Sequence, residues 1–159
     1  MTAPLTIRIQ RDDFDVAREI AALSQGRTDI GAVVTFSGIC RGTEGGDDIA
    51  ALTLEHYPGM AEAEIGRIAT EAVERWPLQG LTVIHRHCKV RPGENIVLVV
   101  AASGHRQAAF EAANFLMDYL KSRAPFWKKE HRADGSEGGW VEAKETDAQA
   151  AKRWKSPSE

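Results

Sequence analysis

The first thirty residues switch from one hydrophobic spacing to another. Residues 5–10 (LTIRIQ) alternate apolar and polar positions, which is typical of a half-buried strand. Beyond them, Phe14 and Ala17 begin an apolar stripe at helical spacing, and either Asp12 or Asp13 can cap that helix. The chain therefore opens with a strand and an amphipathic helix.

Comparable segments follow, separated by Gly and Pro. Apolar or alternating runs predict strands at residues 31–39, 49–57, 81–90 and 95–103. Apolar stripes at helical spacing predict helices at residues 58–76, 104–123 and 146–154. A C-terminal hairpin is expected from residues 126–132 and 138–145, and a mobile loop from the glycines and acids of residues 41–48.

The order of these elements favours an α+β fold. Strands alternate with helices, but turns such as RPGE (residues 91–94) are too short for the crossover between parallel strands. We therefore predict a mixed, largely antiparallel sheet. A length of 159 residues fits one domain over residues 1–159.

Composition excludes several classes of function. A formal net charge of -3 argues against general nucleic-acid binding, which usually needs a basic domain. No segment approaches the roughly 20 apolar residues that span a bilayer, so no membrane insertion is expected. Cys40 and Cys88 form no CxxC pair and suit a reducing compartment, which predicts a cytoplasmic location.

A candidate anion site lies where the strand at residues 95–103 runs into a helix. Free backbone N–H groups at a helix start attract anions, and Arg106 adds a bidentate donor beside His105. The alternative is that Ser103 only caps the helix, with His105 and Arg106 in solvent. The residues alone leave the two interpretations about equal.

A second candidate is the basic segment YLKSRAPFWKKE (residues 119–130). With Arg132 just beyond it, this segment brings five Lys and Arg within fifteen residues, where the overall composition predicts about two. Cations in the last turn of a helix explain Lys121 and Arg123. They do not explain Lys128 and Lys129, which follow Pro125 and stand beside two aromatics that can desolvate an ammonium group. We favour a functional role for this segment.

Other polar residues give weaker signals. Arg41 follows a strand and opens a Gly-rich loop, a frequent binding position, although such an Arg often only faces solvent. His85 and His87 share a strand face without a third ligand at diagnostic spacing, so surface or strand-pairing roles are favoured and no metal is expected. Cys40 is interpreted as a small half-buried residue. No cofactor-binding motif is present in the sequence.

Spacing along the last long helix predicts self-association. His105 and Lys121 are 16 residues apart, which is about 24 Å along a helix axis. Both can reach one small ligand only if the helix start of one protomer faces the helix end of another. A homodimer is therefore expected if they share a substrate.

With these motifs in view, the sequence resembles the large, catalytic subunit of molybdopterin synthase. The resemblance covers nearly the whole chain after the first helix. The stretches that carry it are GAVVTFSG, LTLEHYPGM, VIHR, SGHRQAAFEAANFLMDYLKSRAPFWKKE and WVEAKETDAQAAKRW.

The resemblance implies an α/β hammerhead fold and a homodimer within a heterotetramer. The partner is a small ubiquitin-like sulfur-carrier subunit, whose C-terminal Gly-Gly thiocarboxylate enters a pocket of the large subunit. The implied reaction transfers sulfur to cyclic pyranopterin monophosphate and forms the molybdopterin dithiolene of the molybdenum cofactor. The protein itself would be a sulfurtransferase without a cofactor of its own.

The resemblance also assigns roles to individual residues. Lys121 and Lys128 match the catalytic lysines. The substrate-binding positions are Ile39, Cys40, Arg41, His105, Arg106, Lys121, Lys128, Lys129 and Glu130. Relatives often carry a polar residue where this chain has Ile39, so only its backbone is expected to contribute. Two rival interpretations remain, a non-catalytic phosphate- or nucleotide-binding module and a scaffold that only binds a partner protein.

Overall fold

The computed structural model describes residues 3–141 and 145–155. Its helices are α1 (Val16–Ser24), α2 (Met60–Arg75), α3 (Arg106–Ser122) and α4 (Glu145–Lys152). Its strands are β1 (Leu5–Gln10), β2 (Ala32–Ile39), β3 (Thr43–Glu44), β4 (Asp47–His56), β5 (Leu78–Arg86), β6 (Cys88–Val90), β7 (Asn95–Ser103), β8 (Phe126–Arg132) and β9 (Glu137–Val141).

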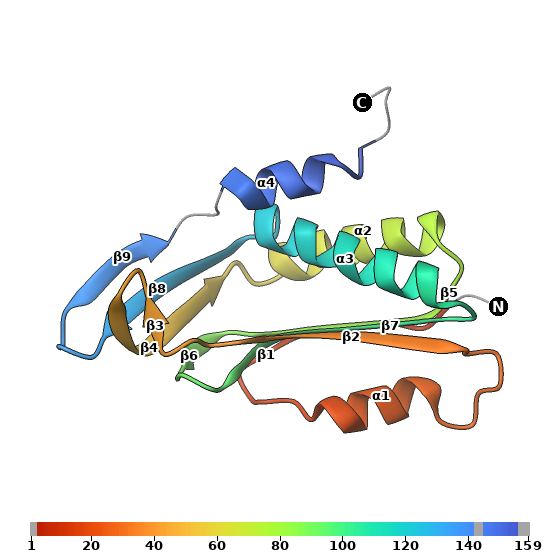
Figure 1. The fold of residues 1–159 in the computed structure, drawn as a ribbon, viewed down its shortest axis with the longest axis horizontal. Coiled ribbons are helices and arrows are strands. Elements are labelled where there is room, and N and C mark those ends of the chain that lie inside the picture. Colours follow the sequence, from red (N-terminus) through yellow and green to blue (C-terminus); the bar gives the residue numbers. More distant parts are fainter. Residues whose placement is uncertain (1–2, 142–144, 156–159) are drawn as a thin grey trace.

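The strands form two separate sheets. The first has the order β1-β5-β7-β2, in which β1 and β5 run parallel and the other pairs run antiparallel. The second has the order β3-β4-β8-β9, with β6 also paired to β4, and its pairs are antiparallel. Figure 1 shows α1 on one face of the first sheet, α2 and α3 on the other, and the second sheet extending from one end.

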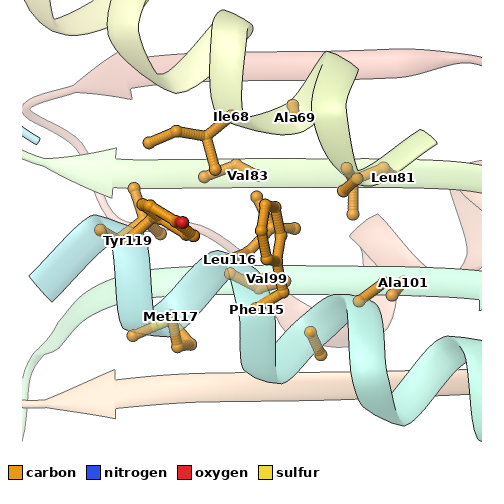
Figure 2. Packing of buried hydrophobic residues seen from close by; sticks show 14 of the residues in the cluster. Ile68, Ala69, Leu81, Val83, Val99, Ala101, Phe115, Leu116, Met117 and Tyr119 are labelled. Atoms are coloured by element: carbon orange, nitrogen blue, oxygen red, sulfur yellow. The ribbon is translucent and has the colours of Figure 1, made fainter. Parts of the chain in front are cut away.

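The core lies between the first sheet and the pair α2 and α3. Strand β7 is buried from Val97 to Ser103, which explains its continuous apolar sequence, because both of its faces are covered. Phe115 and Leu116 of α3 are fully buried and pack with Val83 and Val99 of the central strands (Figure 2). Burial of this stripe fixes α3 on the sheet and thereby fixes the position of both helix ends.

The sequence predictions for the fold are largely confirmed. The architecture is α+β and mostly antiparallel, as expected, and β8 and β9 form the C-terminal hairpin. Of the second hairpin strand predicted at residues 138–145, residues 142–144 lie outside the described part of the chain, and Glu145 begins α4 instead. No helix in residues 3–141 or 145–155 is long and apolar enough to span a membrane. The strand predicted at residues 81–90 is divided into β5 and β6, with Cys88 at a positive φ of 72° just after the break.

Two local predictions were wrong. Residues 41–48, expected as a mobile loop, contain the β3–β4 hairpin, because Gly45 and Gly46 take the positive φ values that its tight turn needs. Helix α1 is capped by Asp15, which accepts from the Arg18 backbone N–H at 3.1 Å. Asp13 instead accepts from the Phe14 backbone N–H at 2.8 Å.

Candidate active site

A cavity of about 460 Å³ opens where the two sheets meet the C-terminal end of α3. Its walls come from the end of β2, from β4, β5 and β7, from the last turn of α3 and from β8. The lining includes the cations Arg41, Lys121 and Lys128 and the carboxylates Glu44 and Glu130. Three cations against two carboxylates, in a partly apolar hollow, suit an anionic ligand of small-molecule size.

The break at Pro125 brings Lys121 and Lys128 to the same cavity. Lys121 lies in the last turn of α3, and the chain then turns at Pro125, which cannot continue a helix, and starts β8 one residue later. Strand β8 pairs with β4, with Lys128 opposite Leu54 in the register. Residues Phe126, Lys128 and Glu130 alternate along β8 and all line the cavity.

The same alternation separates Lys129 from Lys128. The Lys129 ammonium lies 2.8 Å from a carboxylate oxygen of Glu137 and 5.8 Å from the centre of the Trp140 ring, on the β9 side. The hydrogen bond from Lys129 lowers the pKa of Glu137. Among the described residues, Lys129 is not part of the cavity wall, although the sequence grouped it with Lys128 and Glu130.

The end of β2 supplies the opposite wall through Ile39, Cys40 and Arg41. A register shift between Gly38 and Ile39 interrupts the regular pairing of β2 with β7 at this point. Cys40 is only 2% exposed, and burial raises the pKa of its thiol. Ile39 is 53% exposed, and the Arg41 guanidinium forms an ion pair with Glu44. The predicted residues 39–41 thus lie together, with Cys40 more buried than expected.

His85 lines the cavity as well, which the sequence interpretation missed. Its ring stacks on that of Phe126, with centroids 3.7 Å apart and planes 15° apart. Burial is the main cause that lowers its pKa, to about 4, so the imidazole is neutral near pH 7. The sequence did contain a signal for this position. In β5, Leu81, Val83 and His85 are two residues apart and therefore point to the same face of the sheet, where Leu81 and Val83 are buried.

His105 and Arg106 lie at the other end of α3. His105 is the N-cap residue and Arg106 begins the helix, both exposed. Ser103, considered as a simple cap, is fully buried, where its hydroxyl donates to the Pro77 carbonyl at 2.8 Å and accepts from the His105 N–H at 3.4 Å. The helix separates this pair from Lys121 by the predicted length of about 24 Å. Within one chain, the pair His105 and Arg106 therefore lies at a different site from the cavity that contains Lys121.

The described residues contain no group of three or more His, Cys, Asp or Glu side chains that could hold a metal ion. The polar side chains that line the cavity supply lysine ammonium groups, two carboxylates, a guanidinium and a neutral imidazole. Such groups bind oxyanions and move protons.

Fold and cavity together define a class: an α+β protein with a pocket between two sheets that is lined by three cations and two carboxylates. A family model described as the MoaE protein matches residues 9–123, so the chain belongs to the MoaE family.

Similar proteins carry names that agree with this family. The molybdopterin synthase catalytic subunit of Mesorhizobium japonicum is 84% identical over 154 residues, which are 97% of this chain and 96% of that one. Among solved structures, the molybdopterin biosynthesis MoaE protein of Burkholderia ambifaria has a TM-score of 0.80 at 46% identity, covering 94% of this chain and 97% of that one. Molybdopterin synthase of Staphylococcus aureus has a TM-score of 0.75 at 29% identity, covering 84% and 94%.

Proposed function

We propose that this protein is the catalytic subunit of a molybdopterin synthase. It transfers sulfur from the C-terminal thiocarboxylate of a small ubiquitin-like carrier subunit to cyclic pyranopterin monophosphate, and so forms the molybdopterin dithiolene. The observation that carries this proposal is the meeting of Lys121 and Lys128, from two different elements, in one cavity of a MoaE-family chain.

The cavity suits both reactants. In sulfur transfer, the thiocarboxylate sulfur forms a bond to a pterin carbon as the carbon–oxygen bond at that carbon breaks and the oxygen leaves. Water then adds to the acyl carbon of the carrier, which breaks the bond between that carbon and sulfur and restores the carboxylate. Negative charge develops on the acyl oxygen during that step, and an ammonium group in a partly dry pocket stabilises it. We assign this role to Lys121 and Lys128, which both line the cavity, and either can also supply or remove a proton.

The remaining walls hold the ligands in place. Arg41 adds a guanidinium at the hairpin side of the cavity, where Glu44 orients it. Ile39 and Cys40 contribute backbone and a closely packed wall, and Glu130 adds a carboxylate that can accept hydrogen bonds from a pterin. Lys129 is assigned to the β8–β9 hairpin rather than to the substrate, because its ammonium faces Glu137.

The proposal includes a site shared between two copies of the chain. His105 and Arg106, at the start of α3, would bind the phosphate end of the substrate from the neighbouring protomer of a homodimer. Two carrier subunits would complete a heterotetramer. Lys121→Ala and His105→Ala proteins, each inactive alone, should then regain about a quarter of wild-type activity when mixed and allowed to exchange subunits, because half of the dimers hold one intact site. No recovery in demonstrated mixed dimers would exclude the shared site.

Direct reconstitution tests the function. The protein is mixed with thiocarboxylated carrier and cyclic pyranopterin monophosphate, and the dithiolene product is measured. We expect product with the wild type and a loss of roughly 100-fold or more with Lys121→Ala, while carrier binding stays within a few fold. Absence of product with fully loaded carrier would rule out the proposed reaction.

The location we propose is the cytoplasm. Cys40 and Cys88 are both free thiols, and a reducing compartment keeps thiols in this state. Labelling of the protein in fractionated cells would test this, since recovery in an oxidising compartment would contradict it.

A further inference from the structure

His85 occupies the contact between the two sheets at the cavity. It belongs to β5 of the first sheet, and the Phe126 ring on which it stacks belongs to β8 of the second. Strand β8 also carries Lys128, two residues beyond Phe126 and on the same face. The stacked pair therefore sets where Lys128 stands relative to the first sheet.

The hydrogen bonding of the ring fixes its tautomer. Nδ1 of His85 lies 2.7 Å from the carbonyl oxygen of Arg86. A carbonyl oxygen can only accept, so Nδ1 carries the proton and donates it. In a neutral imidazole the other nitrogen, Nε2, is then an acceptor. His85 thus gives the cavity wall a ring nitrogen that accepts and cannot donate.

Charged groups add to the effect of burial, which is the main reason why the His85 imidazole is neutral. The charges of Lys121 on α3, Lys128 on β8 and His56 on β4 each lower the pKa of His85 in addition to the effect of burial. A protonated ring here would place a third positive charge beside two ammonium groups. A neutral ring instead offers, in the same cavity wall, one acceptor nitrogen without a charge of its own.

We propose that His85 is a positioning residue for sulfur transfer, which uses Nε2 to accept a hydrogen bond from a lysine ammonium group of the cavity and its stack on Phe126 to hold Lys128 in place. This inference rests on the proposed function, because it assigns His85 a part in the work of Lys121 and Lys128. Lys121, Lys128 and Phe126 line the same cavity as His85.

The test compares two replacements of His85 in the reconstituted sulfur-transfer reaction. His85→Phe keeps a flat ring for the stack but removes the acceptor, whereas His85→Gln restores an acceptor near the position of Nε2. We expect His85→Phe to lower kcat about tenfold or more with KM within about threefold, and His85→Gln to recover part of that loss. His87→Phe is the control: His87 lies two residues after His85 and, among the described residues, does not line the cavity. Its kcat should stay within about twofold of the wild-type value.

The pH profile separates positioning from a merely structural role. A hydrogen-bond acceptor stabilises the ammonium form of a lysine, so its removal lowers the lysine pKa. The alkaline limb of kcat should therefore move to lower pH by about half a unit in His85→Phe and return in His85→Gln. A lower kcat in both variants, with the alkaline limb of the pH profile at the same pH as in the wild type, would overturn the inference. An active wild type with an unchanged His85→Phe would overturn it too, while an inactive wild type would instead remove the proposed function.

A measurement on the wild type keeps the inference testable if His85→Phe does not fold. Nitrogen-15 NMR of the histidine rings reports the tautomer directly. We expect His85 at pH 7 to be neutral with the proton on Nδ1. An imidazolium, or a neutral ring with the proton on Nε2, would overturn the inference, because either form lacks the acceptor.

Discussion

Phe115→Ala should strongly destabilise the protein, because its ring is the centre of the contacts that hold α3. The side chain is fully buried and packs at 5.2 Å from Trp76, 4.8 Å from Tyr119 and 5.6 Å from Trp154, measured between ring centres. The guanidinium of Arg75 lies 4.9 Å from the same ring centre. These contacts join α2, α3 and the C-terminal segment.

The magnitude follows from this burial. Buried Phe→Ala changes cost about 3–5 kcal/mol, and aromatic neighbours on several sides favour the upper half of that range. For a chain of this length, a loss of about 4 kcal/mol lowers the Tm by about 8–16 °C. Differential scanning calorimetry and urea unfolding of the purified protein measure both quantities.

Phe110→Ala is the matched control on the same helix. Its ring is 60% exposed, so the same change should alter the free energy of unfolding by about 0.5 kcal/mol or less. Both variants are measured over a range of protein concentrations, so that any effect on self-association is seen separately. Equal, concentration-independent losses at the two positions would refute the reasoning that burial within α3 sets the cost.

Three further outcomes are expected. Gly31→Ala should cost about 1–3 kcal/mol in urea unfolding, because its Cβ would lie 2.3 Å from the Gly104 carbonyl oxygen; an unchanged midpoint would contradict this. Iodoacetamide at pH 8 should alkylate Cys88 before Cys40, which is buried and has a raised thiol pKa, whereas equal rates by mass spectrometry would refute that order. The pKa of His85 is about 4 in the folded protein and 6.5 ordinarily, so between these pH values the unfolded chain binds more protons and the free energy of unfolding falls as the pH drops from 6.5 towards 4. His85→Phe should reduce that fall, and a pH dependence of stability identical to that of the wild type would contradict this prediction.

Much of the fold could be predicted because hydrophobic spacing reports burial directly. The run at residues 95–103 was expected as a strand and forms β7 with the same bounds. The hairpin at residues 41–48 was missed because its pairing depends on two glycines at positive φ, and a Gly-rich acidic stretch reads equally well as a loop. The cap of α1 was misplaced because Asp12, Asp13 and Asp15 are all suitable residues, and tertiary contacts decide among them.

The parts of the site that depend on residue type could be predicted from the sequence. The parts that depend on which face of a strand a side chain occupies could not. The density of cations singled out the segment at residues 119–130, and the family resemblance assigned Lys121 and Lys128 within it; both line the cavity. Lys129 was grouped with Lys128 because neighbours in sequence look equivalent until strand register places them on opposite faces. His85 was passed over because its role depends on Phe126, 41 residues further along the chain, which only the pairing of two sheets brings near.

The most direct test of the account compares two neighbouring lysines in the reconstituted sulfur-transfer reaction. Lys128→Met and Lys129→Met make the same chemical change on one strand, the first on the cavity side and the second beside Glu137. We predict that Lys128→Met lowers product formation by roughly 100-fold or more and that Lys129→Met stays within about threefold of wild type. Equal losses, or a larger loss at Lys129, would contradict the claim that this cavity is where sulfur is transferred.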